Sequence, residues 1–128
     1  MIGIVTHGEV VEDQPAFLMR RVYNTAGTDI TQASLSNINY TIHDTSDDSE
    51  LVSSTALTIS TVVFDTLQIT APWLNAGGEA DGYNFGAELP GTGWATPGKV
   101  VQVQVTFDPA SGNDFPAIFR LTVLPWYD

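Results

Sequence analysis

Two runs of alternating apolar and polar side chains, joined by one connection, dominate the pattern of the chain between Lys99 and Leu124. A period of two places every second side chain on the same face of a pleated strand. The connection from Asp108 to Asp114 contains the Pro, Gly, Asn and Asp residues that turns require. The pattern therefore predicts a β-hairpin whose inward row lies in one core between two sheets, with central members Val101, Val103, Val105, Phe119 and Leu121.

Shorter segments upstream show the same alternation and predict further strands. They are Phe17–Tyr23, Ile38–His43, Leu57–Phe64, Leu67–Ile69 and Phe85–Leu89. The alternation in Leu57–Phe64 slips at Thr61, and a β-bulge at that residue would restore it. No longer segment combines a helical period with capping residues, so we expect helices of single turns only.

The N-terminal residues 1–15 have the character of an arm or an edge strand. An apolar run, Ile2 to Val5, precedes a mostly polar stretch, and Pro15, which lacks a backbone donor, marks the start of the next element. In that element Arg20 and Arg21 fall on opposite faces. The strand is either paired on one face or lies near a sheet edge with its arginines extended outward, and we favour the edge.

The spacing of strands and turns is typical of one small domain. A chain of 128 residues is one domain by length, and it has neither an internal repeat nor a linker. We therefore expect residues 1–128 to form a single immunoglobulin-like antiparallel β-sandwich of about seven strands. A small jelly roll or an open barrel is the alternative.

Charge and composition narrow the range of partners. Four basic residues against fifteen acidic ones give a formal net charge of −11, which opposes binding to phosphate backbones and to anionic lipid surfaces. Cysteine is absent, which excludes disulfides and thiolate metal sites. The chain lacks the apolar runs of a membrane span or a signal peptide. We expect a soluble protein made in the cytoplasm, with no nucleic-acid and no membrane partner.

Candidate sites for chemistry are few. The density of charge from Asp44 to Glu50 is expected to keep that loop out of the core. Its carboxylates are weak candidate ligands for calcium, but their spacing is not that of an EF-hand, so we favour a solvated loop; they are Asp44, Asp47, Asp48 and Glu50. His7 and His43 make a poor zinc set without cysteine. No nucleophile motif surrounds any serine, and we expect neither enzyme activity nor a cofactor.

The aromatic residues have two interpretations. Trp73 and Trp94 could stack on sugars or anchor an interface, but tryptophans of a small sandwich more often fill the core. Trp126 and Tyr127 differ, because they follow the last predicted strand, where a core position is hard to arrange. Aromatic residues and apolar terminal strands are both used in protein contacts. We therefore expect an interface that contains Ile2, Ile4, Val5, Trp126 and Tyr127.

One group of known proteins shares features with the second half of the chain. The shared features are Asp65-Thr66-Leu67-Gln68, Trp73, Gly82-Tyr83-Asn84-Phe85, Leu89-Pro90, and the Val100 to Val123 hairpin with Thr106 before its turn and Gly112 within it. In these features the chain resembles short immunoglobulin-like β-sandwich virion structural proteins of tailed phages. The layout is also similar to that of the N-terminal domain of phage baseplate upper proteins.

The resemblance implies a non-enzymatic particle protein that is synthesised in the host cytoplasm and located in the virion. Its partners would be the major capsid protein or other virion proteins, and copies of the chain would associate on the particle. We favour capsid decoration or cementing, and an adaptor in the neck, tail or baseplate is the alternative. An alternative of another class is a carbohydrate-binding or adhesion module, in which exposed tryptophans stack on sugar rings.

Overall fold

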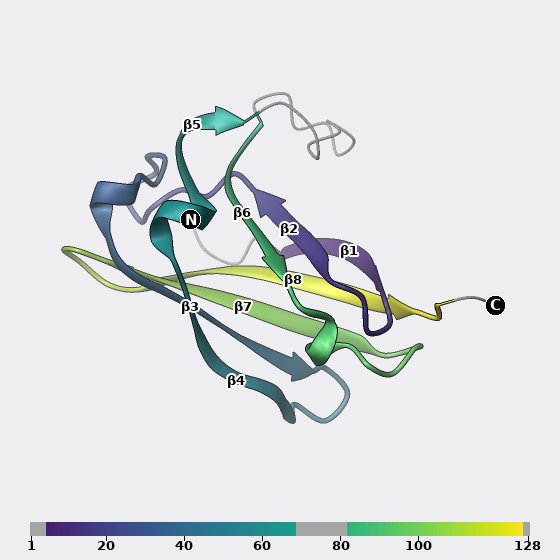
Figure 1. Ribbon diagram of the computed structural model, residues 1–128. Helices are drawn as coiled ribbons and strands as arrows, with labels where there is room; N and C mark the ends of the chain where they lie inside the picture. The colour runs from purple at the N-terminus through teal and green to yellow at the C-terminus, as the bar shows by residue number, and fades with distance from the viewer. Residues whose placement is uncertain (1–4, 69–81, 127–128) are drawn as a thin grey trace.

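A computed structural model describes residues 5–68 and 82–126 of the chain (Figure 1). Its strands form a sheet of five, in the order β1-β8-β7-β3-β4, and a sheet of three, in the order β2-β6-β5. The strands are β1 Val5–Val11, β2 Ala16–Arg20, β3 Leu35–Asp44, β4 Glu50–Leu57, β5 Val63–Gln68, β6 Tyr83–Leu89, β7 Val100–Pro109 and β8 Phe115–Leu124. The helical turns are η1 Gln32–Ser34, α1 Ile59–Val62 and η2 Gly91–Gly93. The expected all-β, two-sheet architecture is confirmed.

The predicted hairpin is confirmed as β7 and β8, which form the centre of the larger sheet. The two strands pair antiparallel, with Val101 opposite Leu121 and Val103 opposite Phe119. All five predicted core residues are at most 3% exposed. On its other side β7 pairs with β3, which adds Ile38, Tyr40 and Ile42 to the same buried row. The inward alternation therefore continues across three neighbouring strands.

The smaller sheet covers this row and closes the core. Phe85 of β6 meets Phe107 of β7 edge to face, with ring centroids 5.5 Å apart, and lies 6.3 Å from the ring of Phe119. Leu18 of β2 and Val63 of β5 are buried on either side of β6. β2 is an edge strand, as favoured for the segment that carries Arg20 and Arg21.

The prediction of one strand from Leu57 to Phe64 is wrong. β4 ends at Leu57, α1 makes a single turn from Ile59 to Val62, and β5 begins at Val63. The chain crosses here from the larger sheet to the smaller one, and Ile59 and Val62, three residues apart, lie on one side of the turn and pack on the core. The slip in alternation at Thr61 is therefore the mark of a helical turn. Among the described residues, no helix is long and apolar enough to cross a membrane.

The N-terminal strand departs from the expected antiparallel pattern. β1 lies at one edge of the larger sheet and pairs with β8 in parallel, with Val5 opposite Ile118 and Val11 opposite Leu124. Val10 is buried opposite Val123 and anchors the strand to the core. The first and the last strand of the described chain are therefore neighbours in the sheet.

Candidate functional site

The two described residues of the expected interface, Val5 and Trp126, lie at opposite ends of the β1 edge of the larger sheet. Val5 begins β1, whereas Trp126 follows β8 and therefore lies beyond the other end of β1. The length of β1 separates them by roughly 20 Å. Ile2, Ile4 and Tyr127 lie outside the described residues. Val5 and Trp126 therefore do not lie in one compact contact on a single chain, although both can lie against a partner that follows the edge.

Trp126 is the most exposed large apolar side chain at this edge. It is 61% exposed, and its backbone N–H donates to Glu12 Oε1 at 2.9 Å. That hydrogen bond holds the backbone after β8 against the end of β1 and leaves the indole in solvent. An exposed indole on a fixed backbone is the kind of anchor on which interfaces concentrate binding energy.

Trp94 has the opposite environment, as the core interpretation predicts. It is 1% exposed, and its indole Nε1 donates to the carbonyl of Gln14 at 2.7 Å. Its own carbonyl accepts from the N–H of Asp13 at 3.0 Å. Gly91, at the start of the same turn, touches the backbone of Asp13 so closely that a Cβ would collide with it. The ring of Trp94 is therefore unavailable for stacking on a ligand, and Trp73 lies outside the described residues.

The expectation that the whole loop from Asp44 to Glu50 stays out of the core is wrong for Asp44. This residue occupies the last inward position of β3, opposite Val101, and its side chain is 5% exposed. Lys99 Nζ donates to its Oδ2 at 2.7 Å, and the N–H and hydroxyl of Ser46 donate to its Oδ1. Lys99 first, and then Ser46, lower the pKa of Asp44 to about 2. A buried charge is acceptable here because hydrogen bonds from the same chain compensate it.

The exposed part of the loop also uses its carboxylates locally. Asp47 Oδ1 accepts from the hydroxyl and the N–H of Ser49, and these bonds lower the pKa of Asp47. Asp48 has a positive φ of 60°, which aspartate tolerates better than most residues. Within residues 5–68 and 82–126, no group of three or more His, Asp or Glu side chains is arranged to hold a metal ion. The geometry is that of a turn stabilised by its own side chains.

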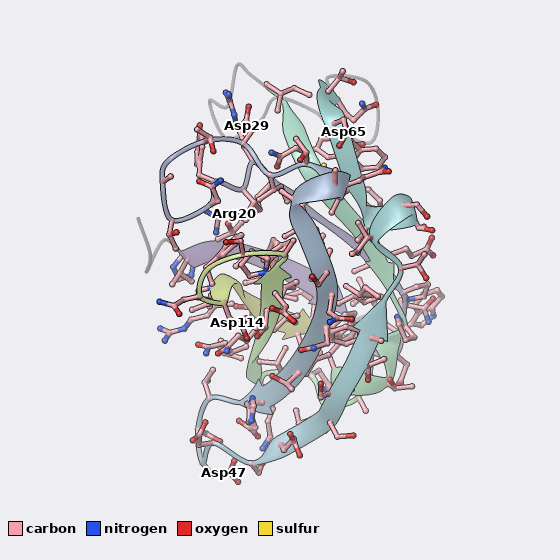
Figure 2. All side chains as sticks on the ribbon, turned by 90° about the vertical axis from the view of Figure 1, so that its left-hand side faces the viewer. Arg20, Asp29, Asp47, Asp65 and Asp114 are labelled. Atoms are coloured by element: carbon pink, nitrogen blue, oxygen red, sulfur yellow. The ribbon has the colours of Figure 1, made fainter. Side chains whose placement is uncertain are left out.

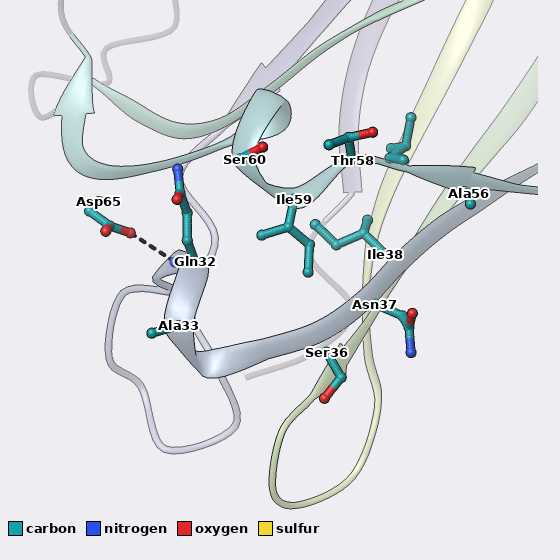
Figure 3. A pocket seen from close by; sticks show the side chains of 11 residues that line it. Gln32, Ala33, Ser36, Asn37, Ile38, Ala56, Thr58, Ile59, Ser60 and Asp65 are labelled. Carbon is teal, nitrogen blue, oxygen red and sulfur yellow. Dashed lines mark hydrogen bonds between the residues drawn. The ribbon is translucent and has the colours of Figure 1, made fainter.

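An open hollow of about 680 Å³ lies where the chain crosses between the sheets (Figure 3). Ile38, Leu57 and Ile59 form part of its apolar lining. Of its polar groups, Asp65 Oδ1 accepts from the N–H of Gln32 at 2.8 Å, and Gln32 Nε2 donates to the carbonyl of Val63 at 2.8 Å. The sequence did not point to this hollow, because α1, which forms one wall, was interpreted there as part of a strand.

No protein-family model, no curated protein and no solved structure matches the chain. The functional interpretation therefore rests on the residues themselves. Two features of the described surface bear on function: an edge with an exposed indole, and a hollow whose polar groups are partly bonded to one another. The first is suited to contacts with another protein.

Proposed function

We propose that the protein is a non-enzymatic structural component of a tailed-phage virion that decorates or cements the capsid. The observation that carries the proposal is the β1 edge, where a terminal strand borders the larger sheet and Trp126 is exposed beside it. Edge strands accept a strand from a neighbouring chain, and exposed indoles anchor such contacts. The resemblance to immunoglobulin-like virion proteins is the reason for proposing a tailed-phage particle as the partner.

The strong negative charge of the chain favours attachment to a partner through a small part of its surface. With a net charge of −11, much of the surface repels other acidic proteins, so a contact has to use apolar or weakly charged regions. The β1 edge combines an apolar strand start at Val5 with the indole of Trp126. An adaptor in the neck, tail or baseplate would use the same edge, and only its position in the particle distinguishes it.

The proposal is tested on purified virions of the phage that carries the gene. Mass spectrometry of the particles should detect the chain, and gold-labelled antibodies should bind along the capsid. Labels confined to the neck, tail or baseplate would replace capsid decoration with the adaptor alternative. Absence of the chain from the particles, together with binding to polysaccharide, would overturn the virion proposal in favour of the carbohydrate-binding class.

The role of the edge is tested with particles that lack the chain. Purified chain added to these particles should bind, and Trp126→Ala should weaken binding by about tenfold or more, as expected for a central aromatic anchor. Tyr23→Ala is the matched control, because Tyr23 is also exposed, at 39%, and forms its backbone bridge with Asp29 rather than with β1. Equal binding of the Trp126→Ala variant and the control would exclude the indole as an anchor.

A further inference from the structure

The outer face of the smaller sheet carries a cluster of aromatic rings. Phe17 of β2, which alternates with the buried Leu18, and Phe64 of β5 both meet Tyr83 edge to face, with ring centroids 6.0 and 5.7 Å from that ring. Gly86 of β6 lies beneath the cluster, where a Cβ would come within 2.5 Å of the Phe17 ring. Phe17 is nevertheless 37% exposed, so the cluster presents an open aromatic surface.

An open hollow of about 460 Å³ lies between this cluster and the helical turn α1. We name it the Phe17 hollow, and its residues include Phe17, Phe64, Gly86, Glu88 and Val62 of α1. Glu88 is the one charged residue among the described residues that line it, and its side chain is exposed. Aromatic rings attract cations, and a carboxylate beside them adds a charged acceptor of hydrogen bonds. The hollow is therefore suited to a cation that donates hydrogen bonds.

The chain supplies no such cation to Glu88. Within the part of the chain that the structure describes, Glu88 has no ion pair. The alternation of β2 places Arg20 on the side of the buried Leu18, away from Glu88. Figure 2 shows Arg20 apart from α1, the teal turn at the right of the view, which borders the hollow. The carboxylate of Glu88 is therefore available to a cation from outside.

A similar pair of groups already holds an arginine elsewhere in the chain. Tyr23 and Asp29 face each other in an antiparallel bridge. The guanidinium of Arg21 lies 5.2 Å from the centroid of the Tyr23 ring, and its Nε donates to Asp29 Oδ1 at 2.9 Å. Phe17 and Glu88 likewise face each other in the antiparallel pairing of β2 with β6, where opposite side chains are close neighbours. The second pair combines an aromatic ring and a carboxylate as the first does, but without an arginine.

We propose that the Phe17 hollow receives an arginine side chain of another protein. The guanidinium lies against the ring of Phe17 and donates to the carboxylate of Glu88. A planar, weakly hydrated guanidinium fits a ring and a carboxylate together better than the compact ammonium of lysine does. The net charge of −11 attracts a basic segment and repels another copy of this chain, which favours a different protein as the source. The inference goes beyond the proposed function, because the hollow lies on the smaller sheet, whereas the β1 edge belongs to the larger one.

The first test titrates the full chain with the capped peptide Gly-Arg-Gly and follows the backbone amide signals by NMR. The peptide should bind with a dissociation constant on the order of 1 mM and shift the signals of Gly86 and Glu88. The same peptide with citrulline, which is neutral, in place of arginine should bind about tenfold more weakly, and Glu88→Gln should weaken the arginine peptide equally. Glu9→Gln is the matched control, because it removes the same charge from an exposed carboxylate of β1. Shifts spread over the acidic surface, or equal weakening by the control, would overturn the proposal.

The second test removes the aromatic ring and keeps the carboxylate. Phe17→Leu leaves an apolar side chain at the hollow and should weaken binding of the arginine peptide by about threefold, with no change for the citrulline peptide. Tyr23→Leu is the control, because the ring of Tyr23 is similarly exposed, at 39%, but already contacts Arg21. Unchanged binding of the arginine peptide by the Phe17→Leu variant would overturn the role of the ring.

The third test decides between another protein and a second copy as the source of the arginine. Sedimentation of the purified full chain should be the same for wild type and Glu88→Gln at every concentration. Self-association of the wild-type chain that Glu88→Gln abolishes would assign the arginine to a second copy and overturn the proposed partner.

Discussion

The β7–β8 hairpin and the β4–α1–β5 segment differ in regularity, because the hairpin keeps its apolar alternation in the folded chain, whereas α1 interrupts the alternation of Leu57–Phe64. The inward residues of β7 and β8 are at most 4% exposed, whereas Leu51 of β4 is 45% exposed. β7 and β8 each have a strand on both sides, while β4 is an edge strand and its register with β3 shifts twice. A repeating pattern specifies structure where neighbours on both sides and a covering sheet enforce it, and an edge lacks that constraint.

The largest test of this comparison places the same charge in both regions. Leu121→Asp should prevent folding, because an unpaired buried carboxylate costs several kcal/mol against a total stability of about 5–15 kcal/mol. Leu51→Asp should fold, because the side chain is already exposed to water. Circular dichroism and urea titration of both variants measure the difference. A Leu121→Asp protein that melts cooperatively would show that the assigned register of β8 is wrong.

Removing one aromatic ring from each region should again destabilise the hairpin more than the β4–α1–β5 segment, but by a smaller difference in unfolding free energy. Phe119→Ala removes a side chain that is 2% exposed and should cost about 3–5 kcal/mol of unfolding free energy. Phe64→Ala removes a half-buried ring of β5 that meets Tyr83 edge to face, and should cost about 1–2 kcal/mol. Equal losses of unfolding free energy for the two variants in denaturant titrations would mean that the two regions contribute equally to the stability of the core.

The turn at Gly91 has irregular backbone, like the β4–α1–β5 segment, but Gly91 is buried. A substitution there therefore tests whether burial alone makes a site sensitive. Gly91→Ala forces a Cβ into the backbone of Asp13 and should cost about 1–3 kcal/mol. Gly8→Ala in β1 is the matched control, because its Cβ would meet Leu121 Cδ2 at an ordinary 3.4 Å. We expect the control to change the unfolding free energy by less than about 0.5 kcal/mol. An unaffected Gly91→Ala variant would show that this turn can move.

Asp44, at the end of β3, should contribute to the dependence of the unfolding free energy on pH. The folded-state pKa of Asp44 is about 2, below its ordinary value of 3.8, so its contribution is complete above that value and is lost as pH falls toward 2. Asp44→Asn should therefore flatten the fall of unfolding free energy across this range. Asp114→Asn should steepen it, because burial first and Asp108 second raise the pKa of Asp114. Parallel curves for wild type and Asp44→Asn would contradict the assigned hydrogen bonds.

The smallest expected effect is that of calcium on the β3–β4 turn. Asp44 and Asp47 already accept hydrogen bonds from Lys99, Ser46 and Ser49. Excess calcium or a chelator should therefore shift the melting temperature by less than about 1 °C. A drop of several degrees on chelation would make the loop a calcium site after all.

Local alternation predicted the centre of the fold, and contacts distant in sequence decided the rest. β7, β8, β3 and β6 follow patterns that can be read along each segment. The burial of Asp44 depends on Lys99, and the parallel partner of β1 is the last strand, so neither is encoded locally. The expected interface placed Val5 and Trp126 together because both lie near chain ends, and only the strand register separates them.

The parallel pairing of β1 with β8 also determines when the chain can complete its fold. Val5 pairs with Ile118, so nearly the whole chain must be synthesised before the first strand finds its partner. The hairpin needs only a short loop to close, whereas β1 must close a loop of almost the full chain length, which is slower. On the ribosome the N-terminal strand therefore waits, with Val10 exposed, until Phe115–Leu124 has emerged from the exit tunnel. During that interval β1 has no strand partner and is open to capture by a chaperone or by the unfilled sheet of a neighbouring nascent chain.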